Sequence, residues 1–181
     1  MKSQRASAKV QPSSAGETLM DKLKLYEVIP HFSLPSSSKK EIDLWSYKQR
    51  KNLVIFFHHG YKCPFCQKKL EELARVYKEI QGFEGEVLAI SFDSLKDTEK
   101  YLEKVAVPFP LLSDQREEAT EKYTYRDEER DAPFPSIFIT DRYEALRYQK
   151  IAHEADQLQG VDDVLGWLLL IQSECPECSH L

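Results

Sequence analysis

Apolar residues follow two patterns along this chain: short unbroken runs, and positions repeated at helical spacing. Unbroken runs of β-forming residues are typical of strands buried on both faces, as in a parallel sheet. The sequence therefore predicts three buried strands with two shorter strands near them. The buried strands are Leu53–Phe57, Val87–Phe92 and Ser136–Thr140, and the shorter ones are Phe109–Leu112 and Tyr143–Lys150.

Apolar positions three or four residues apart predict helices between these strands. One helix is expected over Cys66–Ile80, and a second follows Ser94, which resembles a helix cap. A short helix is expected at Glu117–Tyr123 and a final one at Val161–Ile171. Strands that alternate with helices predict an α/β protein, built as a three-layer α/β/α sandwich.

The remaining segments are less regular. Phe32–Leu34 and Ile42–Leu44 flank a polar turn and are expected to form a small hairpin or an extended entry segment. Leu19–Leu25 is expected to form a short helical turn. The charged run Tyr125–Asp131 is expected to be a solvated loop. Two tryptophans have apolar neighbours and are expected in the core: Trp45 and Trp167.

Length and composition fit a single soluble globular domain. The chain has 181 residues, of which 41% are hydrophobic and 30% charged. With 25 Lys and Arg against 30 Asp and Glu, the formal net charge is −5, which does not favour binding to nucleic acid or to an acidic membrane surface. No apolar run approaches the roughly 20 residues of a spanning helix. We expect a disordered tail over residues 1–20, a domain over 26–172 and a second tail over 173–181.

The expected compartment and the grouping of the cysteines together indicate what the cysteines do. The first residues lack the apolar segment of a secretory signal, so a cytoplasmic protein is expected. The four cysteines form two Cys-x-x-Cys pairs. In a reducing compartment such pairs indicate redox chemistry or metal binding rather than a structural disulfide.

The first pair, Cys63-Pro64-Phe65-Cys66, lies where a buried strand gives way to a helix. Cys63 is predicted at the helix N-terminus, where unpaired N–H groups favour a thiolate, and Cys66 within the first turn. Pro64 fits this position because the first helical turn does not need its missing N–H. The spacing predicts a reactive outer sulfur and a shielded inner one that form a disulfide.

Other interpretations of this pair stay open: half of a zinc site, or two inert buried thiols.

Three basic residues flank the pair, His58, His59 and Lys62. We expect them to be exposed loop residues with no chemical role; the alternative is that they add positive charge beside the sulfur.

Five segments spread over most of the chain carry a family resemblance: 28–35, 42–47, 56–66, 108–114 and 135–141. With them the chain resembles the thioredoxin-fold redoxins, which include the peroxiredoxins of the AhpC/TSA family and the TlpA/ResA-type thiol–disulfide oxidoreductases. The resemblance implies a thioredoxin-like fold with a central mixed sheet. It also implies that Cys63 is the nucleophile, that Cys66 is the resolving cysteine, and that Pro135 is a cis-proline whose neighbouring backbone pairs with substrate.

Two positions depart from the peroxiredoxin pattern. A typical peroxiredoxin has Thr or Ser three residues before its reactive cysteine, where this chain has Gly60. It also has an Arg at the start of the later strand, where this chain has Pro135. Both missing groups would stabilise the reacting sulfur and oxygen. The cysteine pair and Pro135 therefore favour dithiol exchange, whereas the segment 108–114 favours a peroxiredoxin-like lineage.

The second pair, Cys175-Pro176-Glu177-Cys178, follows the last predicted helix and has three interpretations. It is a second dithiol that passes electrons to or from the first pair, half of a zinc site with His180, or an inactive tail. A structural zinc site normally has four ligands, and this tail supplies only three.

The predicted activity is two-electron thiol–disulfide exchange through Cys63 and Cys66. The alternatives are peroxide reduction through the same pair, and a non-enzymatic redox-sensing or zinc-linked interaction protein. The expected partners are a protein or small-molecule disulfide or a hydroperoxide, together with a thiol reductant such as thioredoxin or glutathione. No cofactor is expected.

Overall fold

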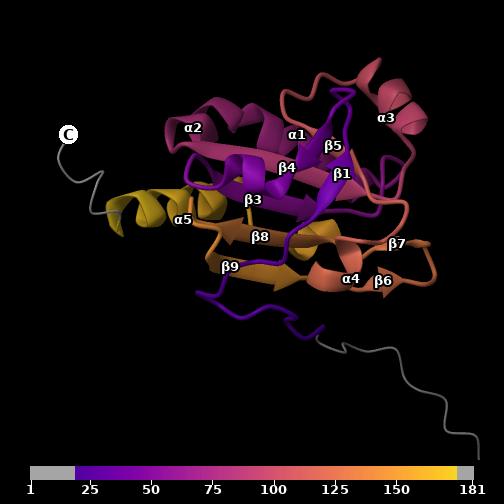
Figure 1. The fold of residues 1–181 in the computed structure, drawn as a ribbon. Helices are drawn as coiled ribbons and strands as arrows, with labels where there is room; N and C mark the ends of the chain where they lie inside the picture. Colours follow the sequence, from indigo (N-terminus) through magenta and orange to yellow (C-terminus); the bar gives the residue numbers. More distant parts are fainter. Residues whose placement is uncertain (1–18, 175–181) are drawn as a thin grey trace, which may run out of the picture.

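The computed structural model describes residues 19–174, and a five-stranded sheet forms the centre of this region (Figure 1). The strand order is β5-β4-β3-β8-β9. The strands are β3 (Asn52–Phe57), β4 (Gly85–Ser91), β5 (Leu111–Ser113), β8 (Ser136–Thr140) and β9 (Leu146–Ile151). The central strand β3 pairs in parallel with β4 and antiparallel with β8, so the sheet is mixed. Every residue of β3 is buried, which explains its unbroken apolar run.

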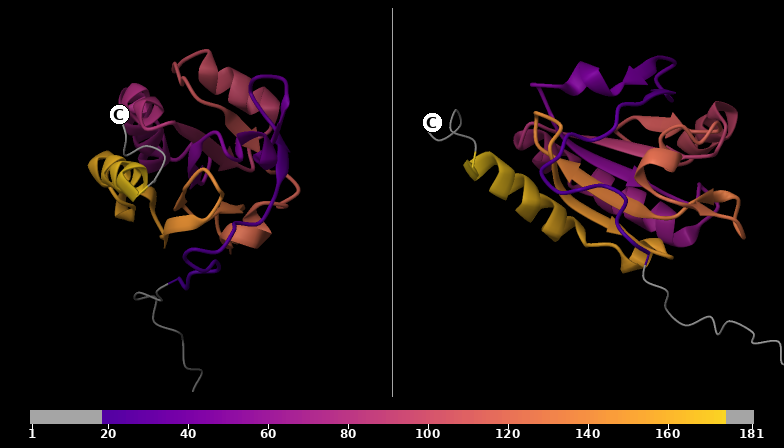
Figure 2. Two further views of the ribbon diagram at one scale, coloured as in Figure 1. Left: turned by 60° about the vertical axis from the view of Figure 1, so that its left-hand side comes forward. Right: turned by 60° about the horizontal axis from the view of Figure 1, so that its bottom comes forward.

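Helices cover one face of this sheet (Figures 1 and 2). They are α1 (Pro64–Arg75), α2 (Tyr77–Gly82) and α5 (Val161–Glu174), with α3 (Leu95–Leu102) next to β5. Their apolar side chains form one core cluster with the side chains that β3 points toward them, Val54 and Phe56. Alternate residues of β3 thus divide between two cores, because successive strand side chains point to opposite faces.

The other face is covered by shorter elements. The hairpin of β1 (Ser33–Pro35) and β2 (Glu41–Asp43) leads into the 3₁₀ helix η1 (Leu44–Tyr47), and α4 (Thr120–Tyr123) lies on the same face. The residues that pack against Ile55 and Phe57 of β3 come from all of these parts: Phe32, Leu34, Leu44, Ala119 and Tyr123. The predicted α/β fold with a mixed sheet is confirmed, as is the hairpin near the N-terminus.

Three predicted features of the scaffold are wrong. Leu19–Leu25 contains no helix. The helix expected over Cys66–Ile80 is broken at Val76, which separates α1 from α2. Trp45 is 64% exposed and lies against the His31 ring, with 4.8 Å between the ring centroids. Trp167 is half-buried and packs against the core, as expected.

The charged run Tyr125–Asp131 is also not a simple solvated loop. Part of it forms β6 (Arg126–Asp127), which pairs with β7 (Ala132–Pro133). Asp127 is only 4% exposed. The two-stranded ribbon therefore folds one carboxylate of an otherwise hydrophilic run into the protein.

None of the helices between residues 19 and 174 combines the length and the apolar composition that a membrane crossing requires. One further 3₁₀ helix, η2 (Ala155–Gln157), lies between β9 and α5 and packs against α1.

Candidate active site

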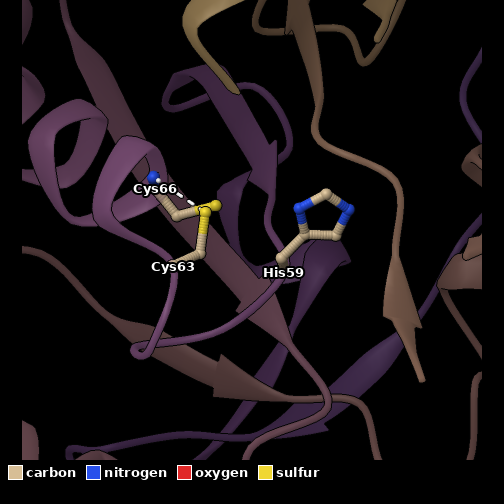
Figure 3. Close-up of side chains that lie close together, drawn as sticks. All are labelled: His59, Cys63 and Cys66. Atoms are coloured by element: carbon tan, nitrogen blue, oxygen red, sulfur yellow. Dashed lines mark hydrogen bonds between the residues drawn. The ribbon is translucent and has the colours of Figure 1, made fainter. Parts of the chain in front are cut away.

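Cys63 lies at the junction between β3 and α1, as the sequence predicts. It is the N-cap residue of α1, with extended backbone angles, and Pro64 is the first helical residue. The backbone N–H of Cys66 donates to Cys63 Sγ over 3.4 Å, drawn as a dashed line in Figure 3. The sulfur thus occupies the position that Ser or Asp oxygens take in ordinary helix caps.

The two sulfurs have different environments. Cys63 is partly exposed, whereas Cys66 is 0% exposed, and both are free thiols. Burial raises the pKa of the Cys66 thiol, and the hydrogen bond and charge of Cys63 raise it further. An accessible outer sulfur beside a shielded inner one is the arrangement expected for a nucleophile and a resolving thiol.

His59 lies beside both sulfurs. Its side chain is 1% exposed, and one of its ring nitrogens and the two Sγ atoms lie within 4.8 Å of one another. Figure 3 shows one ring nitrogen on the side of the sulfurs and the other on the far side. Nε2 is 3.1 Å from Asp127 Oδ2, so the nitrogen that faces the sulfurs is Nδ1. The expectation that His59 is an exposed residue is wrong.

The partner of His59, Asp127, is itself held by several hydrogen bonds. Its Oδ1 accepts from the backbone N–H groups of Glu129 and Arg130, and its Oδ2 accepts from Arg130 Nη1 at 2.9 Å. Arg130 also pairs with Glu154. Burial lowers the pKa of His59 and Arg130 lowers it further, while Asp127 and Glu154 raise it. The net direction favours the neutral imidazole.

His58 is not part of this cluster. It is 0% exposed, and its Nδ1 accepts a hydrogen bond from the Gly60 N–H at 3.1 Å. Its ring stacks on Phe56 and lies 5.4 Å from the ring of Tyr61. Burial lowers the pKa of His58 to about 3. His58 is therefore a neutral part of the core, not the exposed loop residue that was expected.

The loop before Cys63 is fixed by Asp93, which follows β4. Asp93 Oδ2 accepts from the Tyr61 N–H at 3.1 Å and from Ser91 Oγ at 2.9 Å. Gly60 has a φ of +108°. A Cβ at this position would lie 2.6 Å from Asp93 Oδ2. The packing of this loop therefore leaves no room for the side chain whose hydroxyl the peroxiredoxin pattern has three residues before the reactive cysteine.

Pro135 lies directly before β8 and is buried. The cis bond implied by the resemblance is wrong, because residues 19–174 contain no cis peptide bond. The surrounding backbone is also occupied: the Pro135 carbonyl accepts from the Ala152 N–H, and the Phe134 N–H donates to the Tyr125 carbonyl. The Phe134 ring lies 6.3 Å from the His59 ring, which places this segment beside the site. A role for Pro135 in catalysis stays a prediction.

Two other expectations concern residues near the pair and in the tail. Lys62 is exposed, as expected. Cys175 and Cys178 lie outside the described residues. Sequence reasoning assigns Asp127 only to a charged, solvated face and does not connect it with the cysteine pair, since it is 64 residues from Cys63. Strand alternation gave no signal for His59 either, because it places His58 on the same side as Val54 and Phe56, the side that the helices cover.

Comparison with known proteins places this site in a family. The AhpC/TSA family model matches residues 26–149. This chain belongs to the AhpC/TSA family. Its similarity to family members covers most of the described region and includes the strand, loop and helix that carry the cysteine pair.

Individual relatives agree with this assignment. Peroxiredoxin 2 of Thermoplasma acidophilum is 26% identical over 150 residues, which cover 79% of this chain and 73% of that protein. Peroxiredoxin bcp1 of Schizosaccharomyces pombe is 32% identical over 106 residues, or 59% of this chain and 54% of the relative. The structure of peroxidoxin BcpB from Mycobacterium tuberculosis superposes with a TM-score of 0.73 at 20% identity, over 82% of this chain and 98% of that one, which supports the fold. This member of the AhpC/TSA family is a thiol-dependent oxidoreductase.

Proposed function

We propose that the protein catalyses two-electron thiol–disulfide exchange through Cys63 and Cys66. The observation that carries this proposal is the partly exposed Cys63 sulfur at the N-terminus of α1, with the buried Cys66 in the first turn behind it. The exposed Phe65 between them adds an apolar contact for a protein disulfide at the point of attack.

The reaction proceeds in two displacements. The Cys63 thiolate attacks one sulfur of a substrate disulfide, which breaks the substrate S–S bond and releases one thiolate. Cys66 then attacks Cys63 Sγ, forms the Cys63–Cys66 disulfide and releases the second substrate thiol. The Cys66 proton ends on the leaving thiolate. A thiol reductant such as thioredoxin or glutathione returns the pair to the dithiol form.

Peroxide reduction is the second candidate function. It is favoured by the names of relatives of this chain, which are peroxiredoxins. In that reaction the Cys63 thiolate attacks one peroxide oxygen and becomes a sulfenic acid, and the other oxygen leaves as an alcohol or water. Cys66 then condenses with the sulfenic acid to give the same disulfide and water. Both routes share their end product, so the oxidant separates them.

The test offers hydrogen peroxide and a small disulfide separately to the reduced protein, with Cys175→Ser and Cys178→Ser removing the second pair. We expect the disulfide to oxidise the pair, Cys63→Ser to abolish this, and Cys66→Ser to accumulate a mixed disulfide detectable by mass. Peroxide should react no faster than it does with free cysteine. Rapid peroxide consumption that requires Cys63, with a sulfenic acid trapped in Cys66→Ser, would instead establish the peroxidase.

Of the three interpretations of the tail pair, the electron relay is the one that acts on this site, and it has a direct test. Replacement of Cys175 and Cys178 by Ser should then slow reduction of the Cys63–Cys66 disulfide by an external thiol. The initial oxidation of Cys63 should keep its rate. Unchanged reduction with both thioredoxin and glutathione would rule out the relay.

A further inference from the structure

The two sulfurs and His59 form a cluster that disulfide exchange does not by itself require. Cys63 Sγ, Cys66 Sγ and a ring nitrogen of His59 all lie within 4.8 Å of one another. Zinc binds sulfur at about 2.3 Å and imidazole nitrogen at about 2.0–2.1 Å, so ligands in a tetrahedral site are roughly 3.5–3.8 Å apart. Side-chain shifts of about an ångström would therefore be enough to bring these three atoms around one ion.

The burial of the His59 side chain and its missing hydrogen bonds are independent evidence for a ligand. The side chain is 1% exposed, and neither ring nitrogen makes a well-aligned hydrogen bond among the residues that the structure describes. Nε2 still has Asp127 Oδ2 at 3.1 Å, whereas Nδ1 is left to face the sulfurs. An unpaired nitrogen in this position has lost its contact with water without gaining another. Figure 3 shows that it faces the sulfurs across a short gap.

The other side of the imidazole also fits a metal ligand. Asp127 Oδ2 lies 3.1 Å from Nε2 and is fixed by Arg130. Metal-binding histidines usually direct their second nitrogen at a carboxylate or carbonyl, which orients the ring and sets its tautomer. A proton on Nε2 would face the Asp127 carboxylate, and the lone pair of Nδ1 would then face Cys63 and Cys66.

We propose that the reduced protein binds one Zn²⁺ ion through Cys63 Sγ, Cys66 Sγ and His59 Nδ1. Two thiolates and one imidazole are a donor set that zinc prefers, and three protein ligands leave a fourth position open. Binding replaces two thiol protons by the ion and releases both protons to solvent. Oxidation to the Cys63–Cys66 disulfide removes both sulfur ligands, so zinc and the disulfide exclude one another.

The test uses the full chain with Cys175→Ser and Cys178→Ser, so that the tail cannot supply ligands. The protein is reduced, freed of metal, and titrated with Zn²⁺ against a chromophoric chelator. We expect one ion per chain in the reduced form and none in the disulfide form. Asp127→Asn should weaken binding about 10–100-fold, the range found when such outer partners are lost, and His59→Gln should weaken it more. His31→Gln, which changes a partly exposed histidine paired with Asp43, is the control and should bind like the parent.

Circular dichroism shows whether each variant is folded. A second measurement needs no change in the cluster: X-ray absorption of the zinc-loaded parent should show two sulfur ligands and at least one imidazole nitrogen. The proposal fails if the reduced parent binds no zinc, if folded His59→Gln binds it as tightly, or if the absorption shows three or four sulfurs. Disulfide exchange measured in the presence of a chelator tests the proposed function separately, because turnover does not need the ion.

Discussion

The Asp93 side chain packs directly against Gly60, so that a Cβ on Gly60 would lie 2.6 Å from Asp93 Oδ2. The carboxylate holds the loop through the Tyr61 N–H, and the Gly60 φ of +108° suits glycine. The loop that carries the nucleophile thus depends on one residue having no side chain. In the peroxiredoxin pattern this same position carries a hydroxyl, so the loop of this protein has been built differently.

Adding that hydroxyl should damage the protein and not create a better peroxidase. We expect Gly60→Thr to lower the free energy of unfolding by about 1–3 kcal/mol or more, from backbone strain and the clash with Asp93, measured by urea denaturation. Gly166→Ala is the matched control: it lies in α5 with no atom within 4 Å of the added Cβ, and should stabilise by up to about 1 kcal/mol. A stable Gly60→Thr variant with faster peroxide turnover would contradict this account of the loop.

The difference in exposure between the two sulfurs predicts selective alkylation. In the native, reduced protein lacking the tail cysteines, iodoacetamide should modify Cys63 and leave Cys66 unmodified, because Cys66 is fully buried. Peptide mass mapping identifies the modified residue. In urea both cysteines should react, which serves as the control. Equal labelling of the two sulfurs in the native state would show that the inner thiol is not shielded.

Asp127 should matter to stability as well as to the site. Its carboxylate accepts hydrogen bonds from Glu129, Arg130 and the Arg130 side chain, so Asp127→Ala leaves several donors without a partner. We expect a loss of about 1–3 kcal/mol in the free energy of unfolding. Glu128→Ala next to it changes a side chain that is 84% exposed and should stay within about 0.5 kcal/mol of the parent. Equal effects of the two substitutions would contradict the buried role of Asp127.

Asp114 should make stability depend on pH. Burial raises the pKa of this carboxyl, although hydrogen bonds from Thr120 and Ala119 act in the opposite direction. The folded state therefore holds the proton more tightly than the unfolded chain, whose pKa is about 3.9. The contribution of Asp114 is fully present below that value and is lost as pH rises through the folded pKa.

The measurement compares the unfolding free energy of the parent with that of Asp114→Asn across this range. The parent should lose stability relative to the variant as pH rises from about 4. Thr120→Val removes a hydroxyl that donates to Asp114 Oδ2 at 2.7 Å, so it should shift this loss to higher pH. A parent that gains stability relative to Asp114→Asn as pH rises would contradict the prediction.

Local patterns were sufficient for the central strands of this protein and for the start of the helix that carries the cysteines. Leu53–Phe57 is an unbroken apolar run because β3 is the central strand and is covered on both faces. The helix after Cys63-Pro64 begins as predicted, since capping and the proline at the first position act within one turn. Trp45 shows the limit of such reasoning: apolar neighbours along the chain did not reveal that η1 turns its ring to the surface.

The sequence by itself determined the order of strands and helices, and the place of Cys63 at a helix N-terminus with Cys66 three residues on. Those features depend on contacts between residues that are close along the chain. Only the tertiary structure decided what surrounds the sulfurs. The His59 side chain is buried because the β6–β7 ribbon brings Asp127 against it from 68 residues away. Position 60 has room only for glycine because Asp93 fills the space that a side chain would need. Contacts between distant segments leave no periodic trace in the sequence of either one.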